Sequence, residues 1–233
     1  MHIPDGYLGP QTYGPLWGVM LLIWSWASRK VRHTVDARQI PLLALGAAFS
    51  FVIMMFNVPI PGGTTGHAAG GTLVAIVLGT WAAVIALSIA VIIQALLFGD
   101  GGITTIGANC FTMAFAMPLV GFWVYRALTA GSRVSIRRRS LAAGAAGYCS
   151  LNVAAFLTAI MLGLQPLLAH AKNGTPLYCP YPLRVTVPFL VGGHLLVFGW
   201  VEAIVTGMVI AYLAKVDPSL IGSKSLEQRK LAG

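Results

Sequence analysis

The feature of this sequence that most constrains its fold is a series of apolar stretches long enough to cross a lipid bilayer. A membrane-spanning helix needs about 20 mostly apolar residues to cross a hydrocarbon core about 30 Å thick. Stretches close to this length occupy residues 12–28, 40–57, 109–130, 140–165 and 185–214. Only 9% of the residues are charged, whereas roughly a quarter are charged in an ordinary soluble domain. The sequence therefore predicts an all-α integral membrane protein.

A further apolar stretch, residues 68–98, is too long for one span of ordinary tilt. A single helix over this stretch would be about 46 Å long at 1.5 Å per residue. Gly79, Thr80 and Trp81 offer a break near its middle. Two short helices here give a bundle of about seven transmembrane helices, and both must be buried among longer neighbours.

The positions of the basic residues favour seven spans. Clusters of Lys and Arg next to membrane spans mark cytoplasmic loops. Three such clusters follow apolar stretches: Arg29, Lys30, Arg32 and Arg38; then Arg126, Arg133, Arg137, Arg138 and Arg139; then Lys215, Lys224, Arg229 and Lys230. With seven spans, all three clusters lie in the cytoplasm, the N-terminus lies outside and the C-terminus lies in the cytoplasm. With six spans, the loop 133–139 would lie outside.

The same charge distribution predicts how the chain is divided. The net charge of +9 is split among loops rather than gathered on one soluble surface, so we expect no nucleic-acid partner. We expect a single transmembrane domain, residues 1–214, followed by a cytoplasmic tail, residues 215–233. No basic residue precedes the first apolar run, so we expect no cleaved signal peptide and a retained Met1.

The first two residues, Met1 and His2, carry three nitrogens that can chelate a metal. Binding through the α-amine and the His2 amide closes a five-membered ring, and the imidazole Nδ1 closes a six-membered ring. A planar nitrogen set of this kind suits Ni(II) or Cu(II). An α-amine has an ordinary pKa of about 7.7 to 8.0, so a metal competes with its proton near neutral pH. The alternative is that Met1 is only the start residue and His2 a surface side chain.

The loop 57–66 and His67 at its end lie on the same side as Met1 in the seven-span arrangement. His67 therefore offers a fourth nitrogen for the planar set. The prolines and glycines of the loop permit tight turns and a close approach to a ligand. The alternatives are a plain connecting loop and a packing histidine at the start of a helix.

Three further polar residues are candidates for a supporting role. Asp100 and Asn109 belong to a Gly- and Thr-rich outer loop, residues 99–109, which we expect to fold back into the bundle. Asp100 either closes a hydrogen-bond network or caps the following turn. Glu202 lies near the middle of the last span, where a carboxylate needs a partner or is held neutral. It is a proton site, an inner metal station, or a clamp between helices, and His194 lies two turns earlier on roughly the same face.

The remaining histidines and the cysteines suggest no second site. We expect His33 and His170 to be solvated, and Cys110 and Cys149 to pack in apolar surroundings, while Cys179 is left unassigned. The sequence has no GxxxxGK[ST] motif for ATP and no HExxH or GxSxG motif for catalysis. We therefore expect a protein that is not an enzyme, and any use of ATP would need another subunit.

These residues resemble a known family. The opening MHIPDGYLGPQ, the segment HAAGGTLVAIVLG from His67, the run QALLFGDGGITTIGAN from Gln94, and GHLLVFGWVEAIVTG from Gly193 are similar, in this order, to the substrate-binding components of nickel and cobalt energy-coupling factor transporters, the NikM/CbiM family. The sequence differs from the residues common in this family at Thr80, where a proline is frequent, and at Thr112, where an asparagine is frequent.

The resemblance implies a subunit that captures Ni(II) or Co(II) as transported substrate, with no permanent cofactor. It implies Met1, His2 and His67 as metal ligands, with residues 1–11 inserted into the bundle and Asp5 and Gly6 shaping their turn. The implied location is the cytoplasmic membrane of a prokaryote, and the implied role is supplying metal, including cobalt for cobalamin biosynthesis. The implied partners are a transmembrane coupling subunit, two cytoplasmic ATPases and a small accessory membrane subunit.

Two alternatives are weighed against this function. A self-powered secondary divalent-metal transporter or channel should carry a file of charges inside the membrane, and Glu202 is a single site. A structural assembly protein would not need a Met-His start.

Overall fold

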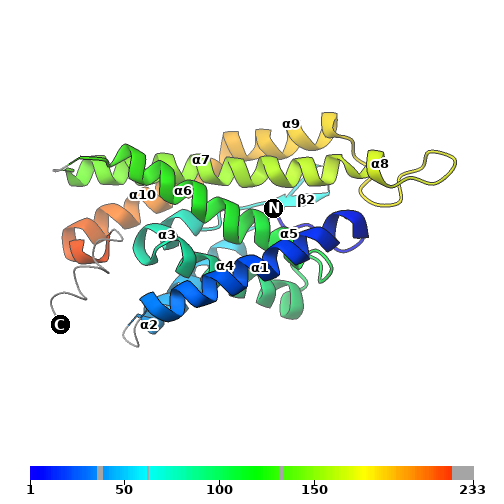
Figure 1. Ribbon diagram of the computed structural model, residues 1–233. Coiled ribbons are helices and arrows are strands. Elements are labelled where there is room, and N and C mark those ends of the chain that lie inside the picture. Colours follow the sequence, from blue (N-terminus) through cyan, green and yellow to red (C-terminus); the bar gives the residue numbers. More distant parts are fainter. Residues whose placement is uncertain (36–38, 62, 132–133, 222–233) are drawn as a thin grey trace.

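The computed structural model describes residues 1–35, 39–61, 63–131 and 134–221, which form an elongated helical bundle (Figure 1). Several residues of the predicted basic clusters lie outside the described residues, namely Arg38, Arg133, Lys224, Arg229 and Lys230. The part of the predicted tail from residue 222 onward also lies outside them.

The α-helices are α1 (Pro10–Thr34), α2 (Ile40–Met54), α3 (Gly71–Leu78), α4 (Thr80–Ile93), α5 (Ile106–Asn109), α6 (Met117–Leu128), α7 (Ile136–Gly163), α8 (Gln165–Leu168), α9 (Leu183–Gly193) and α10 (Gly199–Val216). Three π-helical turns, η1 (Gln94–Phe98), η2 (Cys110–Ala116) and η3 (His194–Phe198), continue or join these helices, and η4 (Pro218–Leu220) is a 3-10 turn. The two strands are β1 (Val58–Ile60) and β2 (Thr64–Gly66).

Four helical segments in the described part of the chain are long and apolar enough to cross a membrane. They are Thr80–Phe98, Ile106–Leu128, Ile136–Leu168 and Leu183–Val216. The chain is thus a multi-pass helical membrane protein. Helix α2 is shorter, with 15 residues. Helix α1 has 25 residues, but its mean hydropathy is lower than that of these four segments. Many of its positions hold Trp, Tyr, Gly or Pro instead of an aliphatic residue.

The predicted break in the stretch 68–98 is confirmed at Gly79. This glycine ends α3 and precedes α4 with φ of +86°, a conformation that residues with a Cβ rarely adopt. Helix α3 has only eight residues, and its first six are buried. Neighbouring helices thus cover this short helix.

The loop 57–66 contains a feature that an all-α prediction misses. Strands β1 and β2 pair antiparallel, with Val58 opposite Gly66 and Ile60 opposite Thr64. Each strand has only three residues, and β1 contains a proline. Such short strands carry too weak a pattern to be recognised in a sequence. The hairpin positions His67, which follows β2 directly.

Close packing of α7 against α10 forms one side of the bundle. A Cβ on Gly144 would lie 3.0 Å from the carbonyl oxygen of Ala203, and a Cβ on Gly147 would lie 3.3 Å from Cγ of Glu202. Small residues at such positions let membrane helices approach closely. This packing fixes the position of Glu202 inside the bundle.

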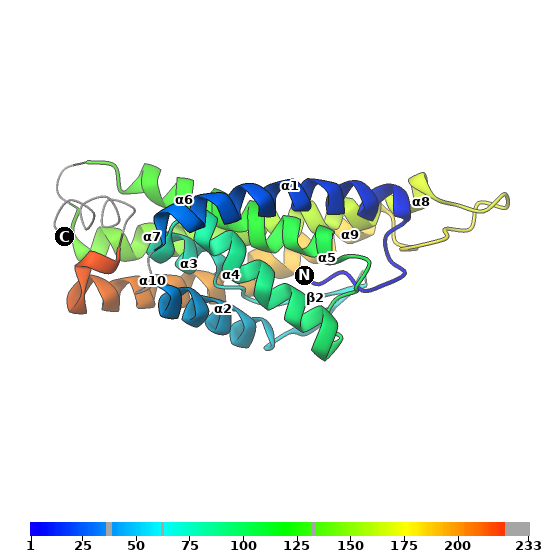
Figure 2. The same cartoon turned by 60° about the horizontal axis from the view of Figure 1, so that its bottom comes forward.

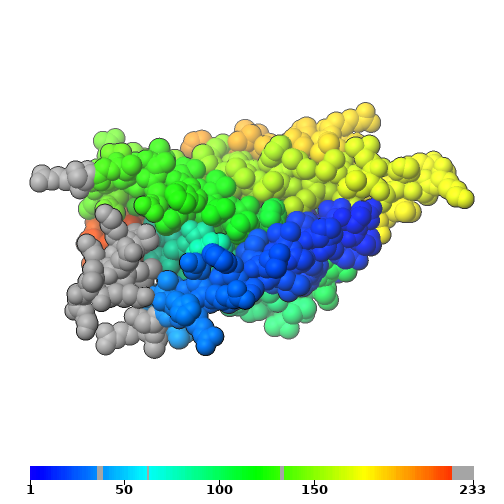
Figure 3. All heavy atoms as spheres, viewed as in Figure 1, coloured from blue at the N-terminus to red at the C-terminus, as the bar shows by residue number. Residues whose placement is uncertain are grey.

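The positions of two histidines and three cysteines can be compared with the prediction from the sequence. The segment between α8 and α9 projects from one end of the molecule (Figure 3). His170 in this segment and His33 at the end of α1 are exposed, as predicted. Cys110 is buried, but the prediction was wrong for Cys149, which lies on the exposed face of α7. Cys179 is buried, and its N–H donates to the carbonyl of Tyr7.

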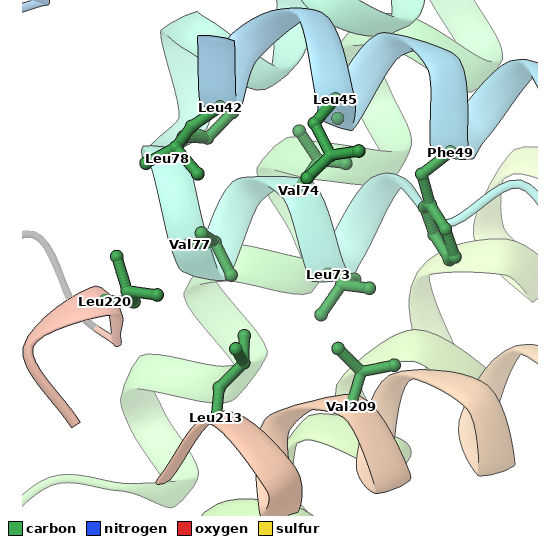
Figure 4. Close-up of a pocket in the computed structure, with 11 residues that line it drawn as sticks. Leu42, Leu45, Phe49, Leu73, Val74, Val77, Leu78, Val209, Leu213 and Leu220 are labelled. Atoms are coloured by element: carbon green, nitrogen blue, oxygen red, sulfur yellow. The ribbon is translucent and has the colours of Figure 1, made fainter. Parts of the chain in front are cut away.

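An apolar pocket of about 290 Å³ lies between α2, α3 and α10 (Figure 4). Its lining consists of Leu42, Leu45, Gly46, Phe49, Leu73, Val74, Val77, Leu78, Val209, Leu213 and Leu220. Because these side chains have no ligating atom, this pocket is not a metal site.

Candidate metal site

The N-terminal segment that precedes α1 enters the bundle instead of lying on its surface. Met1, His2 and Ile3 are all buried, and the N-terminus lies next to β2 and α5 in two views (Figures 1 and 2). The Ile3 N–H donates to Oδ1 of Asn109 at 2.9 Å, and the Ile3 carbonyl accepts from the amide of Asn109 at 3.1 Å. The N–H of Gly102 also donates to that carbonyl, at 2.9 Å. The outer loop thus holds the segment by its backbone.

Asp5 and Gly6 form the turn that leads from this segment to α1. The Asp5 carboxylate accepts from the backbone N–H groups of Ile103 at 3.0 Å and Thr104 at 2.9 Å, and from the Thr104 hydroxyl. These hydrogen bonds, led by the one from the hydroxyl, lower the pKa of Asp5. Gly6 has φ of +81°, which glycine adopts without strain.

His2 is oriented by a glutamine on the neighbouring helical segment. Its Nε2 lies 3.1 Å from Oε1 of Gln94, and the Gln94 amide nitrogen is oriented toward the carbonyl of Phe51. An amide oxygen only accepts, so this contact assigns the proton of the neutral ring to Nε2. Nδ1 then carries a lone pair, and it is buried with no hydrogen bond from any described residue, with Oδ1 of Asp100 at 3.5 Å.

His67 presents a second free nitrogen beside the first. The rings of His67 and His2 are stacked, with centroids 4.8 Å apart. Nδ1 of His67 lies 3.0 Å from the carbonyl of Ala68, which can only accept. Nε2 of His67 therefore carries a lone pair, and it too is buried without a partner.

The α-amine of Met1 completes the group of nitrogens. It contacts the carbonyl and the hydroxyl of Thr65, on the strand that leads to His67. Burial lowers the pKa of this amine to about 4, and burial together with the nearby amine lowers the pKa of His2 to about 3. Both groups are therefore neutral at pH 7, the protonation state that a metal ligand requires.

Asp100 stands beside these neutral nitrogens as the nearest carboxylate. Its Oδ1 lies 3.5 Å from Nδ1 of His2, and its Oδ2 accepts from the Asn57 amide at 2.9 Å. Burial raises the pKa of Asp100. Its contact with Asn57 joins the outer loop to the segment before β1.

Glu202 contacts the backbone that follows His67. Its Oε2 accepts from the N–H groups of Ala69 and Gly70, each at 2.9 Å, and Thr206 contacts the other oxygen. These are the contacts of a clamp between α10 and the start of α3. His194, two turns earlier, instead places its Nδ1 2.7 Å from the Leu190 carbonyl.

Sequence analysis missed two groups at this site. Gln94 orients His2, and Thr64 donates to the His2 carbonyl at 2.8 Å. A buried amide inside an otherwise apolar helix is a signal that could have identified Gln94. Gln94 and His194 each open a π-helical turn, η1 and η3, and such turns are frequent at functional sites.

The composition of the site determines what it can bind. Within the described ranges, no three or more His, Cys, Asp or Glu side chains are grouped to hold a metal. A metal here would depend on main-chain nitrogens as well as the two imidazoles. Fold and site together define a helical membrane protein with a buried, nitrogen-rich site built around its N-terminal segment and one neighbouring carboxylate.

Comparison with known proteins identifies the family. Residues 2–220 match the family described as "CbiM: Cobalt uptake substrate-specific transmembrane region". The chain belongs to this family, also called NikM/CbiM, whose members are transport proteins rather than enzymes.

Individual relatives agree with this assignment. The fused nickel transport protein NikMN of Rhodobacter capsulatus is 50% identical over 96% of this chain and 65% of its own length. The putative metal transport protein MJ1569 of Methanocaldococcus jannaschii is 46% identical over 96% of both chains. A crystal structure of a truncated transition metal transporter is 52% identical, with a TM-score of 0.89 over 92% of this chain and 99% of that chain. This chain thus spans about two thirds of the fused relatives.

Proposed function

We propose that this protein captures Ni(II) or Co(II) from outside and delivers it across the cytoplasmic membrane of a prokaryote, as the substrate-binding component of an energy-coupling factor transporter. The observation that carries the proposal is the pair of partnerless nitrogens, Nδ1 of His2 and Nε2 of His67, buried beside a neutral amine. A buried acceptor without a partner is unfavourable, and a bound metal would remove that penalty.

The proposed ligands are the Met1 amine, the amide nitrogen and Nδ1 of His2, and Nε2 of His67. Four nitrogens in a plane favour Ni(II) and admit Co(II), while Mg(II) prefers oxygen ligands. Cu(II) binds such a set at least as tightly under the Irving–Williams order, so metal availability must contribute to selectivity. The proposed chelate requires a free amine at Met1.

The surrounding contacts support an inserted N-terminal segment, residues 1–11, as part of one metal-binding domain, residues 1–214. Asp5 and Gly6 shape its turn, Asn109 pins Ile3, and Asp100 supplies negative charge next to the cation. Glu202 clamps the turn after His67. We propose seven membrane spans, with the N-terminus outside and the tail, residues 215–233, in the cytoplasm. In this orientation the basic clusters face the cytoplasm.

The proposed partners are a transmembrane coupling subunit, two cytoplasmic ATPases and a small accessory membrane subunit. The relatives named NikMN are fused proteins longer than the part matched here. Release requires protonation of the amide, and dissociation of the neutral amine and of His67 from the metal. ATP-driven reorientation of this subunit against the coupling subunit would break the chelate.

Nickel uptake by cells tests this role against a self-powered secondary transporter or channel. The chain is expressed alone, with its coupling, ATPase and accessory partners, or with an ATPase that cannot hydrolyse ATP. Radioactive nickel should accumulate only with the complete active set. Uptake by the chain alone, driven by an ion gradient, would contradict the proposal and favour the alternative.

A further inference from the structure

His194 is a third buried histidine with a ring nitrogen that no described residue hydrogen-bonds, and it has no role in the proposed chelate. The residue opens η3 on the segment between α9 and α10 and is fully buried. Its Nδ1 lies 2.7 Å from the Leu190 carbonyl, an acceptor that assigns the proton to Nδ1. Nε2 therefore carries an available lone pair, and no hydrogen-bond partner reaches it within the described residues. This is the state in which histidine binds metals.

His194 lies beside the proposed capture site. It is close enough to interact electrostatically with both His67 and the Met1 amine. The His194 ring packs against Phe198, with centroids 5.3 Å apart. Phe198 in turn lies against Gly66, where an added Cβ would approach its ring to 2.0 Å. The η3 turn is thus packed on the residue next to His67.

His67 interacts with two imidazoles in this arrangement. It stacks on His2, and it interacts electrostatically with His2 and with His194. Imidazole nitrogens suit Ni(II), Cu(II) and Co(II) alike. An ion held by His67 could therefore exchange the N-terminal nitrogens for Nε2 of His194.

We propose that His194 is a transfer ligand, which takes a divalent transition metal from the N-terminal chelate through the shared ligand His67 during release. This proposal rests on the proposed function, because it presumes that the chelate captures the metal first. The exchange needs no redox step, since one nitrogen donor replaces another and the ion keeps its charge. A proton returns to the amide as it leaves the metal, while the buried amine leaves as the neutral group.

The test uses the purified full-length chain and Cu(II) alone as a paramagnetic probe. One proline inserted between Met1 and His2 removes the N-terminal chelate, because proline has no amide proton and its nitrogen cannot bridge the amine and the His2 amide. The insertion variant is compared with the same variant carrying His194→Gln, and with a control carrying His170→Gln, whose histidine is exposed in the outer segment. Thermal unfolding of each variant checks folding, and His194→Asn provides a second substitution at the same position.

We expect the insertion variant to keep weak Cu(II) binding through the remaining imidazoles. Outer-shell partners alone change metal affinity by about 10- to 100-fold, so loss of a direct ligand through His194→Gln should weaken this binding at least about tenfold. Pulsed electron paramagnetic resonance should count one imidazole fewer at the copper. His170→Gln should change neither result.

Two results would overturn the transfer role and leave the capture site intact. One is an insertion variant that binds no Cu(II); the other is an insertion variant whose affinity and imidazole count are unchanged by both substitutions at His194. By contrast, an insertion variant that binds as tightly as the unmodified chain would refute the proposed function itself.

Discussion

Replacement of Gln94 by leucine should weaken nickel binding, although Gln94 is not a proposed ligand. Its Oε1 lies 3.1 Å from Nε2 of His2 and assigns the proton to that atom. In Gln94→Leu, the bound state would keep a buried Nε2–H without an acceptor, which costs about 1–3 kcal/mol. The free protein would escape this penalty by moving the proton to Nδ1, which lies 3.5 Å from Oδ1 of Asp100. The proton would then occupy the nitrogen that the metal needs.

This difference between the bound and free states predicts the size of the effect. Because 1.4 kcal/mol corresponds to a tenfold change in Kd, nickel binding should weaken about 5- to 150-fold. Competition titration of the detergent-purified chain against a chelator of known affinity measures it. Gln94→Glu is the matched control, since its carboxylate still accepts from Nε2. An unchanged Kd in Gln94→Leu, with the fold intact, would refute this account of how His2 is oriented.

Three further predictions concern protonation, packing and the clamp. Burial lowers the pKa of the Met1 amine to about 4, so nickel binding displaces only the amide proton. Apparent nickel affinity should therefore rise about tenfold per pH unit from pH 6 to 7.5. An exposed amine, protonated below its ordinary pKa near 8, would make the rise about a hundredfold per pH unit. Gly102→Ala would place a Cβ 2.3 Å from the Asp5 backbone nitrogen, so thermal unfolding should show a free energy of unfolding lower by about 1–3 kcal/mol. Gly14→Ala is the control, because a Cβ there meets no described atom outside its own helix within 4 Å, and it should not lower the free energy of unfolding. Glu202→Leu leaves the N–H groups of Ala69 and Gly70 unpaired and should weaken nickel binding about tenfold. Glu202→Gln keeps an acceptor for these groups and should retain most of the affinity. Equal Kd values for the two variants would argue against the clamp.

Hydropathy and motif spacing predicted the features that depend on local sequence. The apolar stretches identified the helices, and Gly79 identified the break between α3 and α4. The Met-His start and the position of His67 suggested that the three residues proposed as ligands come together. Each of these depends on a short segment or on a count of spans.

Features that depend on packing between distant segments were not predictable in this way. Gln94 contacts a histidine 92 residues away, and no periodicity reveals such a pair. The exposure of Cys149 follows from which face of α7 packs against its neighbours. Glu202 was predicted to need a partner, but that partner is the backbone of Ala69 and Gly70, whose N–H groups any sequence would carry.

The most direct test of the central claim is nickel binding by the unmodified chain beside two variants. One variant carries a proline between Met1 and His2, which has no amide proton and so breaks the chelate, and the other carries His67→Ala; His170→Ala is the control. The account predicts one tightly bound Ni(II) per unmodified chain, with the absorption spectrum of planar nitrogen coordination, and loss of that tight binding and spectrum in both variants but not in the control. Undiminished binding by the insertion variant would place the metal elsewhere in the bundle and contradict the N-terminal chelate.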